Sequence, residues 1–267
     1  SPIQDSIPSA MGPPRTHPIP TSAWAHCVLS KLRFAAADAG IYTCTSSLQH
    51  DSRATLLLDA LEELWRHVSS QLTPESRERF ITAMEHHLHA VSLQQSSNVA
   101  LVGGEACNAE MGMAEYMAIR RQSSGFMVGF ELVQYVLGLD EDPIHLHPIV
   151  EELRDLVLDY MCMCNDVVSC RTETVAGDYF NLPCVVYNSG AVGSFQEAVE
   201  RVAHMMRRVD ARCVQVVEVI QHDHSELMKK EPRLQGYVDT MVSCMSGTLC
   251  WSFETVRYGL CSNLSNC

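Results

Sequence analysis

Three oxygen-bearing side chains recur at four-residue intervals past the middle of the sequence. Asn165, Ser169 and Glu173 follow one another at this spacing, and an α-helix turns by about 100° per residue, so the three lie on one helical face. Amide, hydroxyl and carboxylate oxygens are hard ligands of the kind that magnesium accepts. Because burying them on an apolar helix is costly without a charged ligand, the pattern predicts a divalent-metal site.

The elements that must position this triad are predicted to be helices. Thr73-Pro74 and the Ser194/Glu197 pair have the residue types of helix N-termini. The sequence shows no strand ladder and no internal repeat, so we expect an all-α bundle of antiparallel helices. Apolar periodicity and capping residues predict helices over residues 22–37, 54–71, 74–91, 111–137 with a break near 123–125, 148–173, a long helix after 194, and 234–258.

The organisation of the chain follows from these segments. Residues 1–22 are rich in proline and read as an N-terminal tail, residues 23–258 as one helical domain, and residues 259–267 as a C-terminal tail. A polar connector near residues 40–53 interrupts the domain. The length of 267 residues is sufficient for one large helical domain.

Composition narrows the classes of function. The net charge of −13 at pH 7 argues against nucleic acid as a partner, because phosphate backbones attract clustered Lys and Arg. No apolar run reaches the length of a membrane span. Twelve cysteines scattered through predicted helices indicate reduced side chains in the core, so we expect a cytoplasmic protein. The sequence leaves the oligomeric state open.

Histidine pairs raise the alternative of a zinc hydrolase. His86 and His89 share a helical face, and further pairs occur within residues 145–147 and 222–224. No cysteine or carboxylate stands beside them at a spacing typical of zinc sites. We therefore interpret these histidines as solvated positions and keep the zinc hydrolase as a third hypothesis.

The triad is part of a run that resembles the second metal motif of class I terpene synthases. The resemblance is to fungal, particularly basidiomycete, sesquiterpene synthases, and it covers residues 54–258. It implies a class I terpenoid synthase-like antiparallel helical bundle. The segments that carry it, in the family's order, are Glu115–Arg121 followed by Gly125, Asn165-Asp166-x-x-Ser169-x-x-x-Glu173, Gly177-Asp178 with Asn181-Leu182, and Trp251 followed by Arg257-Tyr258.

The resemblance also implies a chemistry. The enzyme would ionise and cyclise farnesyl diphosphate, a prenyl diphosphate substrate, with Mg2+ as the cofactor and pyrophosphate as the leaving group. The triad Asn165, Ser169 and Glu173 would hold one magnesium ion. The side chains that would contact the diphosphate are Arg120, Arg121, Arg171, Arg257 and Tyr258, with Arg120, Arg257 and Tyr258 in catalytic roles.

Two points about these roles stay open. Either Arg120 or Arg121 would sense the diphosphate through its forked donors, and the sequence does not decide between them. An apolar, aromatic pocket would have to shield the carbocation from water. The aromatic candidates for that lining, each of which could equally be an ordinary core residue, are Phe126, Phe130, Tyr160 and Trp251.

One element of the family is missing from the sequence. An aspartate-rich first metal motif should precede the Leu64-Trp65 segment, but only the short polar connector occupies that place. Asp59, Glu62 and Glu63 are acidic, but they fall in the segment that resembles a later helix. A faulty gene model, a splice variant or a decayed copy would each account for the gap. The alternative function is therefore a catalytically impaired paralogue that retains the fold and the diphosphate-binding elements.

Overall fold

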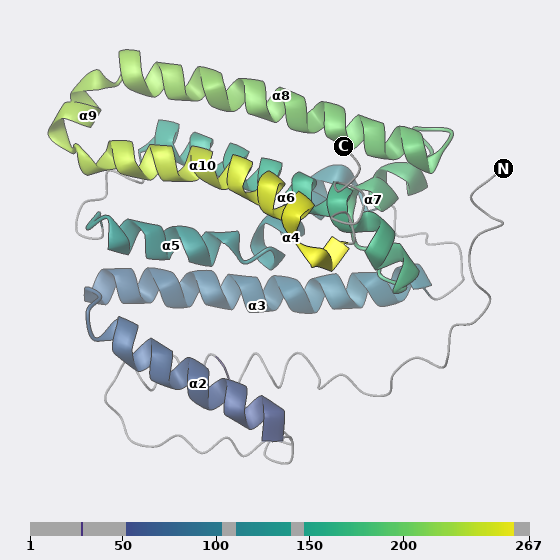
Figure 1. The fold of residues 1–267 in the computed structure, drawn as a ribbon, viewed down its shortest axis with the longest axis horizontal. Helices are drawn as coiled ribbons and strands as arrows, with labels where there is room; N and C mark the ends of the chain where they lie inside the picture. The colour runs from purple at the N-terminus through teal and green to yellow at the C-terminus, as the bar shows by residue number, and fades with distance from the viewer. Residues whose placement is uncertain (1–27, 29–51, 103–110, 140–146, 259–267) are drawn as a thin grey trace.

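The computed structural model describes residues 28, 52–102, 111–139 and 147–258, and these form helices without a single strand (Figure 1). The predicted all-α fold is confirmed. Both predicted tails, most of the predicted helix at 22–37 and the connector up to residue 51 lie outside the described residues. The helices are α2 (Ser52–Ser69), α3 (Pro74–Val102), α4 (Met113–Ser123), α5 (Phe126–Val136), α6 (Pro148–Val175), α7 (Leu182–Asn188), α8 (Phe195–His222), α9 (Ser225–Lys230), α10 (Arg233–Glu254) and the 3-10 turn η4 (Val256–Tyr258).

Helix α6, which carries the triad, lies at the centre of the bundle. It packs against α8 and α10 along its length and also contacts α4, α7 and η4. Its first half is buried in the largest apolar cluster, together with residues of α5, α8 and α10, among them Leu153, Val157, Val216 and Met241. Helix α3 contacts α4 and α5, and α2 lies on the far side of α3 from α6 (Figure 1). The core therefore fixes α6 from several sides.

Side-chain caps explain where three helices begin. The Thr73 hydroxyl accepts a hydrogen bond from the Ser76 amide at 3.1 Å, and Pro74 begins α3. The Ser194 hydroxyl accepts from the Glu197 amide at 3.2 Å. Both start positions were predicted from the sequence, because an oxygen-bearing side chain satisfies an amide that has no partner within the helix. His147 caps α6 in the same way, through the Ile149 amide.

A break separates α4 from α5 at the predicted place. Gly125 has φ 77°, a left-handed conformation that favours glycine. A Cβ there would also stand 3.4 Å from the His87 ring of α3, whose Nδ1 lies 3.0 Å from the Gln122 carbonyl oxygen at the end of α4. The break therefore ends α4 directly after its two arginines, Arg120 and Arg121.

The structure differs from the sequence prediction at several places, and one is α3, which runs to Val102 although the sequence predicts a helix only over 74–91. The helix expected over residues 234–258 ends at Glu254, and the chain continues into η4, so Tyr258 turns back toward α6. The short helices α7 and α9 were not predicted, because a helix of six or seven residues shows too few apolar repeats. On α2, the apolar side chain of Leu64 is 61% exposed, whereas its neighbour Trp65 is buried against Phe80.

Two further expectations from the sequence, reduced cysteines and no membrane-spanning helix, can be compared with the described part of the chain. The seven cysteines located there are free thiols. Five of them are buried, as expected for core residues, but Cys244 is half-buried and Cys250 is exposed. Burial raises the pKa of the Cys162 thiol to about 12, which keeps it protonated and inert. In the described ranges we find no helix with the length and apolar character needed to cross a membrane.

Candidate active site

The triad lies on one face of α6, as its spacing predicted. Ser169 is buried, whereas Asn165 and Glu173 are half-buried. The Ser169 hydroxyl donates to the Asn165 carbonyl oxygen at 2.7 Å, so its oxygen lone pairs remain available for a ligand. An amide oxygen, a hydroxyl oxygen and a carboxylate on one face form a donor set that fits a hard divalent cation.

Glu173 lies in surroundings that disfavour its charge. Burial raises the pKa of its carboxyl above the ordinary value of 4.5, and the nearby Asp166 and Asp178 raise it further, while Ser169 and Arg120 oppose the shift. Asn181, the N-cap of α7, donates from Nδ2 to Glu173 Oε2 at 3.2 Å. A half-buried carboxylate of raised pKa gains stability when a cation binds beside it, which is consistent with a metal-ligand role.

Arg120 connects α4 to the start of the triad. Its Nη2 donates to Asn165 Oδ1 at 2.7 Å, and its Nε donates to Asp166 Oδ1 at 2.9 Å. Burial lowers the pKa of the guanidinium, but Asp166, Tyr116 and Cys162 together outweigh burial and raise the pKa above its usual range. Arg120 is therefore a permanent, largely buried cation beside the predicted metal ligands.

Asp166 joins three elements through its carboxylate. It is 1% exposed. Its Oδ2 accepts from the Tyr116 hydroxyl at 2.5 Å and from the Leu182 amide at 3.2 Å, in addition to the Arg120 bond to Oδ1. Charge-assisted hydrogen bonds of this kind are among the strongest in proteins. Asp166 therefore holds α4 and the start of α7 against α6 at the level of the triad.

The two neighbouring arginines of α4 have different partners. Arg121 makes a forked ion pair with Asp159, with Nε–Oδ1 and Nη2–Oδ2 distances of 2.6 and 2.7 Å. Asp159 lies nearly two turns before the triad on α6. Arg171 is exposed, and helical geometry places it about 200° around the axis from Ser169. Among these arginines, the structure brings only Arg120 to the triad.

The C-terminal turn returns to the site through Tyr258. Its hydroxyl accepts from Asn165 Nδ2 at 2.8 Å, and the ring is packed edge-on against Trp251 at a centroid distance of 6.0 Å. Arg257 is exposed, and its guanidinium carbon lies 5.6 Å from the centroid of the Tyr258 ring, a cation–π geometry. Tyr258 therefore contacts the triad through Asn165, whereas Arg257 lies beside the Tyr258 ring and is exposed to solvent.

A hollow of about 450 Å³ opens beside Asn165, between α5, α6 and α10. Phe126 and Trp251 contribute to its wall, whereas Phe130 and Tyr160 belong to the apolar core. The aromatic candidates are thus divided between lining and core positions. Met161 of α6 adds an apolar side chain beside Asn165. The remaining lining residues are small or polar and come from α10: Thr240, Ser243, Cys244, Gly247 and Thr248.

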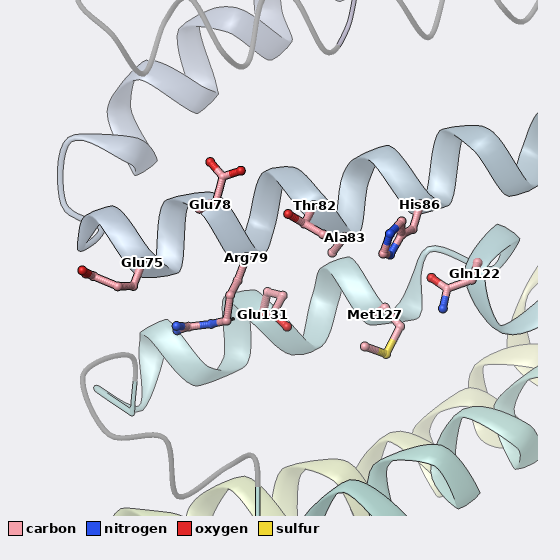
Figure 2. A pocket seen from close by; sticks show the side chains of 9 residues that line it. All are labelled: Glu75, Glu78, Arg79, Thr82, Ala83, His86, Gln122, Met127 and Glu131. Atoms are coloured by element: carbon pink, nitrogen blue, oxygen red, sulfur yellow. Dashed lines mark hydrogen bonds and ion pairs between the residues drawn. The ribbon is translucent and has the colours of Figure 1, made fainter.

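A second hollow, of about 480 Å³, lies between α3 and α5 (Figure 2). Figure 2 shows Arg79 reaching from α3 toward Glu131 on α5, and the two form an ion pair at 3.3 Å. His86 borders this hollow. The residues that the structure describes contain no group of three His, Cys, Asp or Glu side chains placed to hold a metal, so the described part offers no support for a zinc hydrolase.

The acidic residues of α2 are not near the triad. Helix α2 is separated from α6 by α3 (Figure 1). Asp59 and Glu63 are exposed, and Glu62 forms an ion pair with Arg66 one turn later at 2.6 Å. These side chains do not stand in for the aspartate-rich motif.

Sequence reasoning gave no role to several residues that complete the site. Tyr116 precedes Arg120 by four residues, so helical spacing could have placed both on the same face. Asp166 directly follows Asn165 in the motif, but the four-residue spacing gave it no function. Asn181 and Asp159 act through contacts between separate helices, which no local pattern could have revealed.

The chain is similar in sequence to known terpene synthases. The family described as terpene synthase family 2, C-terminal metal binding, matches residues 33–209. The chain is 28% identical over 205 residues to the microbial terpene synthase-like protein 13 of Selaginella moellendorffii, covering 76% of this chain and 53% of the relative. It is 28% identical over 202 residues to sesquiterpene synthase 1 of Postia placenta, covering 74% and 55%. The chain thus spans about half the length of these curated relatives.

Solved structures show the same fold. The crystal structure of α-eudesmol synthase superposes with a TM-score of 0.67 at 19% identity, over 91% of this chain and 74% of that one. Germacradien-4-ol synthase from Streptomyces citricolor gives a TM-score of 0.63 at 22% identity, over 88% and 70%. With a family match over residues 33–209, the chain belongs to terpene synthase family 2.

Proposed function

We propose that this chain acts as a class I terpene synthase that ionises farnesyl diphosphate and cyclises the resulting cation to a sesquiterpene, with Mg2+ as cofactor. The observation that carries the proposal is the position of Asn165. It shares a helical face with Ser169 and Glu173, contacts both Arg120 and Tyr258, and lines the hollow. Hard oxygen ligands and a buried cation are the groups needed where a diphosphate leaves as an anion.

Each side chain has a separate task in this proposal. Asn165, Ser169 and Glu173 would hold one magnesium ion, which when bound supplies positive charge to neutralise the departing pyrophosphate. Arg120 senses the diphosphate rather than Arg121, because Arg121 is committed to Asp159 on both sides of its fork. Arg257 contributes a further cation from the solvent side.

The hollow beside Asn165 provides a place for the prenyl chain. Its volume of about 450 Å³ falls in the range of pockets for small ligands. Phe126 and Trp251 present aromatic rings that would favour a carbocation and help to exclude water. The names of the relatives in Postia placenta support a fifteen-carbon substrate class, since they are called sesquiterpene synthases.

The test is incubation of the purified chain with farnesyl diphosphate and Mg2+, followed by gas chromatography–mass spectrometry of the volatile products. We expect a cyclic sesquiterpene that disappears when a chelator is added and in the Glu173→Ala variant. A product that persists in either control would contradict the proposed metal site.

A second candidate is a paralogue that binds the diphosphate without turnover. One observation favours it: the segment before Leu64 carries no aspartate-rich run. Isothermal titration with inorganic pyrophosphate and Mg2+ separates the candidates. Binding without product supports the second, and insertion of a family-like aspartate-rich segment after Gly40 should then restore product formation.

A further inference from the structure

We propose that Asn181 is a positioning residue for the metal site, which holds the Glu173 carboxylate in the orientation that a divalent cation needs. This inference rests on the proposed function of the triad and goes further in naming a residue outside α6 on which that site depends. Glu173 lies in the last turns of α6, which ends at Val175, whereas Asn181 is the N-cap of α7. The contact between them therefore joins two helices at the metal site.

The position of Asn181 is fixed by burial and by two contacts at the start of α7. The residue is 0% exposed. Its Oδ1 accepts a hydrogen bond from the Cys184 amide at 3.1 Å, which caps the first turn of α7. The amide of the next residue, Leu182, donates to Asp166 Oδ2 at 3.2 Å, and the Leu182 side chain is buried in an apolar cluster with residues of α8. The backbone and the amide oxygen of Asn181 are therefore both held, so its nitrogen Nδ2 has a defined direction.

The orientation of the Asn181 amide suits the carboxylate. Nδ2 donates to Glu173 Oε2 at 3.2 Å. Exchanging the amide oxygen and nitrogen would bring Oδ1 against a carboxylate and Nδ2 against the Cys184 N–H, so both contacts would be lost. One side chain thus supplies an acceptor for the helix start and a donor for the carboxylate. With Oε2 bonded to Asn181, the other oxygen of Glu173, Oε1, serves as the metal ligand.

Glu173 depends on a donor because of the charges around it. The negative charges of Asp166 and Asp178 act against the charge of Glu173. A half-buried carboxylate that other carboxylates repel stays in place only where donors hold it. Partners that hold a ligand side chain before the metal arrives typically account for about 10- to 100-fold in metal affinity. Asn181 is such a partner for Glu173.

Manganese binding provides a readout that does not depend on turnover. Electron paramagnetic resonance measures free Mn2+ in titrations of the purified full chain in the presence of inorganic pyrophosphate. The test variant is Asn181→Ser, whose hydroxyl can still cap α7 but is too short to reach Glu173. We expect this variant to bind Mn2+ about tenfold more weakly than the wild-type chain.

A shortened carboxylate shows whether Asn181 acts through Glu173. Glu173→Asp keeps the charge but withdraws the carboxylate by one carbon, so this change alone removes the contact with Asn181. Adding Asn181→Ser to Glu173→Asp should then lower Mn2+ affinity by less than about twofold, because the interaction is already lost. A merely structural effect of Asn181→Ser would reduce the affinity by the same factor in both backgrounds.

A second helix start provides the matched control. Ser194 caps α8 through the Glu197 amide, just as Asn181 caps α7 through the Cys184 amide. Ser194→Ala removes that cap away from the triad, so its Mn2+ affinity should stay within about twofold of wild type. An affinity loss in Ser194→Ala as large as in Asn181→Ser would show that any weakened helix start lowers affinity, and would overturn the positioning role.

The outcomes distinguish this inference from the proposed function. If the wild-type chain binds Mn2+ and Asn181→Ser binds it equally well, or loses as much affinity in the Glu173→Asp background, the positioning role is overturned while the metal site stands. If the wild-type chain does not bind Mn2+ at millimolar concentration, the metal site itself is wrong. Should Asn181→Ser fail to melt cooperatively, Asn181→Thr keeps a hydroxyl cap and fills more of the buried space, and the same comparison applies to it.

Discussion

The α6 side and the α2 side of the molecule carry similar acidic side chains in very different surroundings. On α6, Asp166 is 1% exposed and Glu173 is half-buried, and both are bonded to residues of other helices. On α2, Asp59 and Glu63 are exposed, and Glu62 pairs within its own helix. The acidic groups of α6 are therefore held by contacts with other helices, whereas Asp59 and Glu63 of α2 lie exposed at the surface.

This difference shows why residue type alone does not identify a site. A carboxylate in water gains little from a bound cation, because solvent already stabilises its charge. A half-buried carboxylate of raised pKa gains much more, since the cation replaces lost hydration. Burial and cross-helix contacts, more than acidity, separate the candidate metal site from a charged surface.

The largest effect is expected when one of the triad side chains proposed to bind the metal is removed. Asn165→Ala or Glu173→Ala should weaken Mn2+ binding in the presence of pyrophosphate by at least about 100-fold, because even indirect partners of metal ligands cost 10- to 100-fold. Glu63→Ala on α2 is the matched control and should leave affinity within about twofold. Equal losses in Glu63→Ala and Glu173→Ala would contradict the separation of the two sides.

The next largest effect is expected at the buried carboxylate. Asp166→Ala leaves the Arg120 guanidinium buried without its charge partner, and such losses cost about 3–5 kcal/mol. Arg121→Gln breaks an ion pair whose arginine is 35% exposed, and should cost about 1 kcal/mol or less. Urea denaturation followed by circular dichroism measures both. A smaller loss in Asp166→Ala than in Arg121→Gln would show that the Asp166 network does not hold α4 and α7 to α6.

The pH dependence of stability tests the same contrast between α6 and α2 at Glu173. The pKa of Glu173 in the folded chain is raised above the ordinary value of 4.5. At pH values between the unfolded-state pKa and the folded-state pKa, the folded chain therefore binds more protons than the unfolded chain. The contribution of Glu173 to stability is therefore favourable below the unfolded-state pKa and is lost as pH rises through the folded-state pKa. Glu173→Gln should become more stable relative to wild type as pH increases from 5 to 8, by urea denaturation at each pH.

Glu63→Gln on the exposed side provides the reference for this measurement. Its stability relative to wild type should stay flat over the same pH range, since Glu63 is exposed and has similar surroundings in the folded and unfolded chain. A rising difference in Glu63→Gln as large as in Glu173→Gln, or a flat one in both, would overturn the assignment of the raised pKa to burial on α6.

The smallest effect is expected at the C-terminal turn. Tyr258→Phe removes the acceptor for Asn165 Nδ2 but keeps the ring against Trp251. One neutral hydrogen bond contributes about 1 kcal/mol, so the melting temperature should fall by only a few degrees. An unchanged contribution of Trp251 to the fluorescence would confirm that η4 stays packed. A loss of more than about 3 kcal/mol would show a larger structural role for Tyr258.

Much of the structure on the α6 side could be predicted because the sequence signals for it lie within a few residues of one another. The four-residue spacing of Asn165, Ser169 and Glu173 fixes a helical face, and Pro74 and Ser194 mark helix starts. The break at Gly125 follows from a conformation that favours glycine. Local rules of this kind operate within a few residues of the chain, so a single sequence is sufficient.

The rest depends on contacts between distant segments. The choice of Arg120 over Arg121 was left open because both lie on α4, and only the packing of α4 on α6 assigns one to Asp166 and the other to Asp159. The return of Tyr258 to Asn165 bridges residues 93 positions apart. Such pairings are set by tertiary packing, for which the sequence pattern carries no direct signal.

The most direct test of the account is an anomalous diffraction map from crystals grown with Mn2+ and inorganic pyrophosphate. We predict a manganese peak coordinated by Asn165 Oδ1, Ser169 Oγ and the Glu173 carboxylate, with Arg120 bonded to the pyrophosphate instead of to Asn165. A map with manganese bound elsewhere, or with pyrophosphate held away from Arg120, would contradict the assignment of the α6 face as the metal and diphosphate site.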